Sequence, residues 1–416
     1  MTDNQLPASA KLKLDLMFEG IRYTEALSRA AEHSFPNYYP YRFDDDEHDP
    51  TGTGRAEVPY MLVTPDDTHA CLQLHRTSPW SVSGSREEGY ELRRDGSGEA
   101  LAIGFEPAQQ WMTGRTSDDV SNAQAGLSLH GDMLVINVAP ACEYFTVPKQ
   151  DDRSMNCSFC RYGAPTKRNR EMGQVMGQTA LPDSLYRRMQ EVLTAALDET
   201  PVRHIYLVGG SLTDPREEGI RYAELARRVQ EVNRNRIPVT CGSGALPEES
   251  LRLLHGEGLV DAVSFNLEIW SEDLFARICP GKHRYVGYQN WIAYLEKALE
   301  LWGDGRVYSA MVAGVEIDPE IGLSVEEAAV IAVRGADDLC SRGIAPTYSL
   351  YWPRPGRDYP KHLKNLREYF THLQRGYQEI RRARGIELWE GFMCHRCAYM
   401  QIECDVDRGA AAAAAG

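Results

Sequence analysis

Apolar runs alternate with segments of helical periodicity along the chain from residue 131 onward. The run at 133–138 (MLVINV) is bounded by Gly131 and Pro140, and a short apolar run between turn residues is typical of a buried strand. Further along, Leu185 and Met189 begin a series of apolar positions spaced like one face of a helix. The alternation predicts strands at 133–138, 204–208, 237–241, 260–265, 307–312 and 345–350. It predicts helices that open at 182–184 and that span 216–233, 247–257, 272–278, 288–302, 325–342 and 359–384.

Six strands that alternate with helices indicate an α/β fold with a parallel sheet and crossover helices. The order suits an open doubly wound sheet or a partial (β/α)6 TIM-like barrel, and in both cases functional residues collect at the carboxyl ends of the strands. Cysteine, glycine and polar residues do follow the predicted strands. They are Cys142 after the first strand, Gly209, Gly210 and Ser211 after the second, Ser243 after the third, Asn266 and Glu268 after the fourth, and Glu316 after the fifth.

The first 130 residues lack this rhythm. Residues 35–53 mix aromatic, acidic, proline and glycine residues, which is typical of loops, and short β-like runs follow at 60–64 and 70–74. We therefore expect an N-terminal extension, partly β, at 1–130 and an α/β core at 131–356. A helical, cysteine-rich C-terminal extension at 357–416 completes the predicted organisation.

Composition and charge narrow the classes of function. The chain has 416 residues, of which 43% are hydrophobic and 25% charged, as in ordinary globular proteins. A formal net charge of −15 argues against broad nucleic-acid binding, which depends on a basic surface. No apolar run reaches the roughly 20 residues that cross a bilayer, and the first residues lack the apolar core of a secretory signal. We expect a cytoplasmic protein with no membrane partner, whose ten cysteines are thiols or metal ligands rather than disulfides.

Three cysteines follow the first predicted strand with the spacing C-x14-C-x2-C. Cys142, Cys157 and Cys160 suit a [4Fe–4S] cluster, because thiolates hold such clusters and three of them leave one iron open to a substrate or cofactor. The alternatives are a structural zinc site, which usually needs a fourth ligand that this loop lacks, and three unrelated thiols. Glu143 and Asp152 are poorer candidates for the first ligand, because carboxylates suit iron–sulfur clusters less well than thiolates.

With these cysteines, the chain resembles the radical S-adenosylmethionine (radical SAM) superfamily, especially its biotin synthase-like small-molecule branch. Phe159 precedes the last cysteine, as an aromatic residue commonly does in that family, and Gly209-Gly210-Ser211 resembles its glycine-rich motif. Residues 312–316 (VAGVE) and 346–356 resemble the segments that end its fifth and sixth strands, so the resemblance covers about 131–356. The family's usual spacing is C-x3-C-x2-C, and the long first gap departs from that pattern.

The resemblance implies a partial (β/α)6 barrel that holds a [4Fe–4S] cluster and SAM, whose amino and carboxylate groups bind the open iron. It also implies roles for residues at the strand ends. Gly209, Gly210 and Ser211 would approach the methionyl part of SAM, and Ser243, Asn266 and Glu268 would bond its ribose hydroxyls or amino group. Arg277 and Lys282 would bind the carboxylate, and Glu316 would lie beside the adenine. A helix cap or turn role is the alternative for Ser243, Asn266 and Glu268, and a solvated cation beside a Pro-Gly turn is the alternative for Lys282.

A second group of cysteines lies in the C-terminal extension. Cys394, Cys397 and Cys404 have the spacing C-x2-C-x6-C, with His395 inside it. Radical SAM enzymes often carry extra clusters in such extensions, so the resemblance implies an auxiliary [4Fe–4S] cluster here. Zinc bound by these cysteines with His395 is one alternative, and a lid of free thiols is the other.

Taken as a whole, the resemblance implies an enzyme that cleaves SAM reductively to a 5′-deoxyadenosyl radical, which abstracts hydrogen from a small organic substrate. Rearrangement, bond cleavage or group insertion would follow. Four basic residues after the cluster motif would dock an acidic electron donor such as flavodoxin or ferredoxin, or would form a solvated loop. They are Arg161, Lys167, Arg168 and Arg170. The alternatives for the chain are a tRNA-modifying radical SAM enzyme and a non-catalytic zinc-binding α/β protein.

Overall fold

The structure, a computed structural model, describes residues 6–35, 57–149, 154–160, 180–351, 359–388 and 402–415. The chain forms two compact units. The first, named here the N-terminal unit, comprises Met1–Gln109, Trp352–Thr371 and His395–Gly416. The second, the barrel unit, comprises Gln110–Tyr351 and His372–Cys394. Within the described residues, no helix has the length and apolar character needed to cross a membrane.

A seven-stranded sheet forms the centre of the barrel unit, in the order β12-β11-β10-β9-β8-β7-β6. The strands β7 to β12 are parallel, and each overlaps a range predicted from the sequence. β6 pairs antiparallel with β7 across a turn at Gly131, whose φ of 65° suits glycine. The strands are β6 (Leu127–His130), β7 (Met133–Ile136), β8 (His204–Leu207), β9 (Val239–Ser243), β10 (Ala262–Phe265), β11 (Val307–Ala313) and β12 (Ala345–Leu350).

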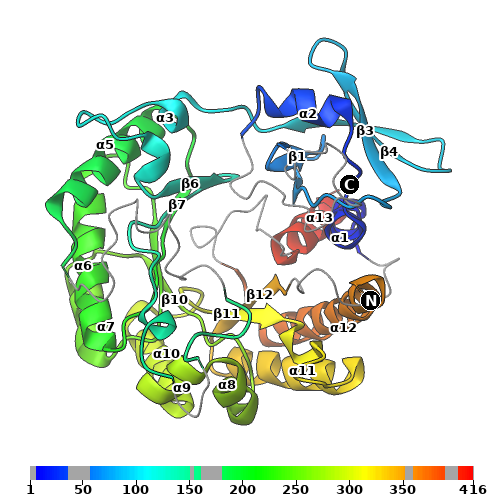
Figure 1. Ribbon diagram of the computed structural model, residues 1–416. Coiled ribbons are helices and arrows are strands. Elements are labelled where there is room, and N and C mark those ends of the chain that lie inside the picture. Colours follow the sequence, from blue (N-terminus) through cyan, green and yellow to red (C-terminus); the bar gives the residue numbers. More distant parts are fainter. Residues whose placement is uncertain are drawn as a thin grey trace. The chain divides into compact units, whose positions relative to one another are not determined.

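Helices follow the parallel strands and lie on the outer side of the curled sheet (Figure 1). The predicted α/β class and partial TIM-like barrel are therefore confirmed. One side of α5 is buried at Leu185, Met189, Val192, Leu193 and Ala196, as its helical period predicts. The helices are α5 (Asp183–Glu199), α6 (Pro215–Val232), α7 (Glu248–Gly256), α8 (Glu272–Ile278), α9 (Pro280–Tyr285), α10 (Tyr288–Trp302) and α11 (Val325–Ser341). The first half of α12 (Tyr359–Arg384) belongs to the N-terminal unit and the second half to the barrel unit.

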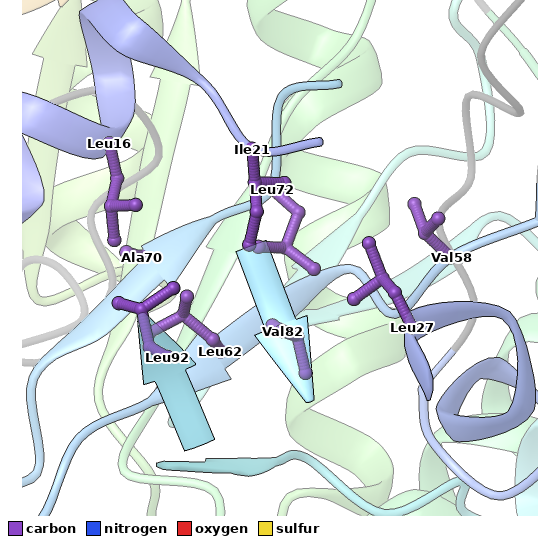
Figure 2. Close-up of a cluster of buried hydrophobic side chains, with 9 residues drawn as sticks. All are labelled: Leu16, Ile21, Leu27, Val58, Leu62, Ala70, Leu72, Val82 and Leu92. Atoms are coloured by element: carbon purple, nitrogen blue, oxygen red, sulfur yellow. The ribbon is translucent and has the colours of Figure 1, made fainter. Parts of the chain in front are cut away.

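An antiparallel five-stranded sheet, in the order β2-β1-β5-β4-β3, forms the centre of the N-terminal unit. Apolar side chains from its helices, its strands and the segments between them gather in one buried cluster (Figure 2), namely Leu16, Ile21, Leu27, Val58, Leu62, Ala70, Leu72, Val82 and Leu92. The elements are α1 (Ala8–Glu19), α2 (Glu25–Ala31), β1 (Met61–Val63), β2 (His69–Cys71), β3 (Trp80–Ser85), β4 (Gly89–Arg94), β5 (Ala100–Phe105) and α13 (Glu403–Ala415).

A buried ion pair joins α1 to α13 within the N-terminal unit. The Nζ atom of Lys13 lies 2.8 Å from Oδ2 of Asp405, and both side chains are almost completely buried. Arg408 donates to the other oxygen of the same carboxylate. Because a buried charge is costly without a partner, this pair ties the two helices to each other.

Candidate functional site

A cavity of about 160 Å³ lies at the carboxyl ends of β7, β8, β9 and β10 in the barrel unit. Its walls come from the loops that follow these strands, from the segment 154–160 and from Lys282 of α9. The lining includes many of the residues predicted to bind the cluster or SAM, namely Cys142, Cys157, Cys160, Gly209, Gly210, Ser211, Ser243, Asn266 and Glu268. The long gap in the cysteine motif therefore does not separate its first cysteine from the other two.

The three thiols reach the cavity from two short segments. Cys142 directly precedes the 3₁₀ turn η3 (Glu143–Phe145), and the other two cysteines lie in the segment 154–160. Burial raises the pKa of Cys142 to about 12. A hydrogen bond with Cys279, together with burial, raises the pKa of Cys157. Binding of a metal centre to these thiols would release protons, because the ligand is the thiolate. In the part of the chain that the structure describes, no three His, Cys, Asp or Glu side chains are grouped as ligands of a single metal ion.

Backbone hydrogen bonds hold the segment 154–160 against the junction of α8 and α9. The N–H of Ser158 donates to the carbonyl of Ile278, and the N–H of Gly281 donates to the carbonyl of Met155, each at 2.9 Å. A Cβ at Gly281 would lie 2.5 Å from the same Met155 oxygen, so this close approach requires glycine. The C-x2-C pair is thereby fixed beside the start of α9.

The glycine-rich loop after β8 packs against the loop that carries Cys142. The N–H of Gly210 donates to the carbonyl of Ala139 at 2.9 Å. A Cβ at Gly210 would lie 2.2 Å from the carbonyl oxygen of Ala141, a distance that no side chain tolerates. The glycine is therefore needed for the packing of two cavity loops, and its lack of a side chain also leaves the backbone open to a ligand.

We expect Gly210→Ala to lower the free energy of unfolding by about 1–3 kcal/mol, because the added methyl group forces two packed loops apart. Urea unfolding followed by circular dichroism would measure the change. Gly256→Ala is the matched control, since a Cβ at the end of α7 meets no atom within 4 Å. Equal stability of the two variants would show that the loops are not packed as described.

Glu143 links the cysteine loop to the glycine-rich loop. Its N–H donates to the carbonyl of Ser211 at 2.9 Å. Its carboxylate accepts hydrogen bonds from the N–H of Thr213 at 2.6 Å and from the hydroxyl of the same residue at 2.8 Å. The carboxylate is thus engaged with the neighbouring loop, which gives it a structural role distinct from the ligand role considered in the sequence. Asp152, the other carboxylate considered there, lies outside the described residues.

Glu268 and Lys282 form a buried ion pair in the cavity wall. The Nζ atom of Lys282 lies 2.6 Å from Oε1 of Glu268 and donates to the carbonyl of Asn266 at 2.5 Å. It also lies 4.8 Å from the ring centroid of Trp291, a cation–π contact. Burial raises the pKa of the Glu268 carboxyl. Burial disfavours the Lys282 ammonium, but the Glu268 carboxylate and nearby thiols outweigh it and raise the pKa of that lysine.

This pair settles one alternative left open by the sequence. The side chain of Lys282 is 8% exposed, so the reading of Lys282 as a solvated cation is wrong. The pair also supplies the partner that a buried Glu268 requires. The backbone of Glu268 is in the left-handed region with a φ of 71°, a costly conformation that non-glycine residues adopt mostly where the surroundings impose it. Lys282 and Glu268 are fourteen residues apart in the chain, so no local sequence pattern predicts that they pair.

Two residues with predicted SAM contacts lie outside the cavity lining. Arg277 is exposed and donates to the carbonyls of Glu320 and Ile321. Glu316 is 3% exposed, and its carboxylate accepts from the N–H of Gly314 at 3.0 Å. Their contacts with the SAM carboxylate and adenine stay predictions.

The predicted C-terminal metal site falls only partly on the described residues. Cys394 and Cys397 lie outside them, as do the basic residues Arg161, Lys167, Arg168 and Arg170. Cys404 is described and is buried near the start of α13. Burial and nearby carboxylates raise the pKa of its thiol.

No family model matches the sequence. A curated relative, bacteriochlorophyllide c C-7(1)-hydroxylase of Chlorobaculum limnaeum, is 22% identical over 300 residues, which cover 68% of this chain and 69% of the relative.

Solved structures with similarity to the chain include three proteins. SuiB of Streptococcus suis bound to S-adenosylmethionine is 15% identical, with a TM-score of 0.39 over 64% of this chain and 48% of SuiB. The FeFe-hydrogenase maturase HydG of Carboxydothermus hydrogenoformans is 14% identical, with a TM-score of 0.38 over 59% of this chain and 52% of HydG. A radical SAM methyltransferase of Sphaerobacter thermophilus is 17% identical, with a TM-score of 0.38 over 76% of this chain and 78% of that protein. The chain thus spans about half the length of SuiB and HydG. The resemblance expected from the cysteine and glycine motifs is confirmed: the chain is similar to a curated hydroxylase and to solved proteins that include a radical SAM methyltransferase.

Proposed function

We propose that this chain holds a [4Fe–4S] cluster through Cys142, Cys157 and Cys160 and cleaves SAM reductively beside it. The observation that carries the proposal is the cavity at the carboxyl ends of parallel strands, which three cysteines and a glycine-rich loop line together. The donor set fits the group, because thiolates are the ligands of iron–sulfur clusters and three of them leave one iron for SAM.

When bound, the cluster supplies an electron and SAM supplies a 5′-deoxyadenosyl radical for hydrogen abstraction. The residues of the cavity wall would hold SAM. Gly209 and Gly210 have no side chains, so their backbone groups are accessible to SAM in the cavity. Ser243, Asn266 and Glu268 offer oxygen atoms to the ribose hydroxyls or the ammonium group. The ammonium group of Lys282 balances the charge of the Glu268 carboxylate in the cavity wall. The carboxylate therefore keeps its position whether or not SAM is bound.

We infer a small organic substrate. The curated relative acts, by its name, on a small pigment molecule, and the net charge of −15 opposes binding to RNA. Flavodoxin or ferredoxin is proposed as the electron donor, since the cluster needs a low-potential donor. The cysteines of the site are thiols rather than disulfides, which suits the reducing conditions of the cytoplasm. An auxiliary [4Fe–4S] cluster on Cys394, Cys397 and Cys404 stays a prediction.

Anaerobic purification, reconstitution with iron and sulfide, and reduction by dithionite in the presence of SAM test this function. We expect a brown protein that converts SAM to 5′-deoxyadenosine, measured by liquid chromatography and mass spectrometry. A colourless preparation that retains zinc and leaves SAM intact would contradict the proposal and favour the zinc-binding alternative. Co-purified nucleic acid that RNase removes would indicate an RNA substrate instead of a small molecule.

A further inference from the structure

The beginning of α6 carries three side chains that bond the backbone of the cavity loops after β8 and β9 and of the end of β9. Glu218 accepts from N–H groups of both loops, Arg221 donates to the carbonyl of Gly210, and Tyr222 donates to the carbonyl of Gly242 at 3.0 Å. The two loops are the ones that follow β8 and β9, and both line the cavity. One turn of α6 therefore contacts the backbone of both loops.

Glu218 is the residue that joins the loops to each other. Its Oε2 accepts from the N–H of Leu212 at 2.9 Å, and its Oε1 accepts from the N–H of Gly244 at 2.7 Å. The side chain is buried, with 2% exposure of the residue, and it does not line the cavity. Since each oxygen serves a different loop, the carboxylate sets the distance between them.

The geometry leaves little freedom for the loops to move independently of Glu218. A Cβ at Gly244 would lie 3.0 Å from Oε1 of Glu218, and a Cβ at Gly209 would lie 3.2 Å from the hydroxyl of Tyr222. The glycines thus bring the loop backbones into contact with α6. A carboxylate is the acceptor that satisfies both N–H groups at once, whereas an amide turns its NH₂ group toward one of them.

We propose that Glu218 is a positioning residue that fixes the separation of the loops after β8 and β9 and thereby sets the affinity for SAM. This inference rests on the proposed function, because it assigns SAM to the cavity that the two loops line. Glu218 acts through the loop backbones, and it touches neither the cluster ligands nor the cavity.

The test compares Glu218→Gln with Glu231→Gln in the reconstituted full chain. Glu231 is an exposed residue near the other end of α6, so the control makes the same chemical change on the same helix away from the loops. For Glu218→Gln we expect an approximately tenfold rise in the Kd of SAM, measured by equilibrium dialysis, and a matching rise in the KM for SAM. We expect unchanged iron per chain and a kcat at saturating SAM within about twofold of the wild type. The control should leave every value unchanged.

Tyr222→Phe provides a second variant if Glu218→Gln does not fold. It removes the hydrogen bond to Gly242 at the end of β9, directly before the loop that Glu218 holds, and we expect a roughly threefold rise in the Kd of SAM. A Kd for SAM that stays at the wild-type value in either folded variant would overturn the inference, as would a loss of stability and iron without a change in KM. If the wild-type chain binds iron but never cleaves SAM, the proposed function fails instead, and the two failures are distinguishable.

Discussion

Cys157→Ala is expected to lower the iron bound per chain and to reduce the formation of 5′-deoxyadenosine at least a hundredfold. Cys157 supplies one of three thiolates, and even the loss of an outer partner of a metal ligand costs about 10–100-fold in affinity or activity. Among the described residues, the cavity lining holds no thiol besides Cys142, Cys157 and Cys160. Iron and sulfide analysis after anaerobic reconstitution, together with a timed assay of 5′-deoxyadenosine, measures both effects.

Cys340→Ala is the matched control for this variant. Cys340 is also a buried thiol, at 3% exposure, but it lies in α11 and does not line the cavity. We expect it to retain iron and activity. Full iron content and activity in Cys157→Ala would exclude the ligand set Cys142, Cys157 and Cys160.

Lys282→Met is expected to lower the free energy of unfolding by about 3–5 kcal/mol, because it leaves Glu268 as an uncompensated buried charge. The two side chains are only 8% and 12% exposed, so solvent does little to replace the lost cation. The pKa of Lys282 is raised in the folded chain above its usual value of 10.5. Its stabilising contribution is therefore complete below pH 10.5 and is lost as the pH rises through the folded pKa. Denaturant unfolding at pH 7 measures the change.

Two further variants distinguish the cost of the uncompensated Glu268 charge from the cost of removing any lysine. The double variant Lys282→Met with Glu268→Gln removes both charges and should recover most of the lost stability. Lys297→Met removes a lysine of α10 whose partner Glu300 is largely exposed, and it should cost no more than about 1 kcal/mol. Equal losses for Lys282→Met and Lys297→Met would contradict the buried pair.

The parallel strands β7 to β12 could be predicted because each is a short apolar run between turn residues. The polar residues that follow those runs could likewise be placed at one end of the sheet, since parallel strands end together. Gly210 was identified in this way without any knowledge of its contacts. β6 and α9 were not predicted. β6 lies in a region without the alternating rhythm, and α9 (PGKHRY) is too short and polar to show a helical period.

Contacts between distant segments could not be read from periodicity. Cys157 and Cys279 lie far apart in the sequence, yet their thiols share a hydrogen bond. Glu218 looks like one of several acidic residues in the first turn of a helix, and only the three-dimensional fold shows that it is buried between two loops. Such pairings depend on how crossover helices pack, which a one-dimensional pattern does not specify.

The ion pair between Lys13 and Asp405 has a consequence for the order in which the chain folds during translation. Lys13 leaves the ribosome before every strand of the barrel, whereas Asp405 emerges after all of these strands have been made. Domains generally fold as units while synthesis proceeds from the N-terminus. Here the N-terminal unit gains the contact between α1 and α13 only after the barrel strands have been made. We therefore expect the strands of the barrel to pair on the ribosome before α13 emerges and contacts α1.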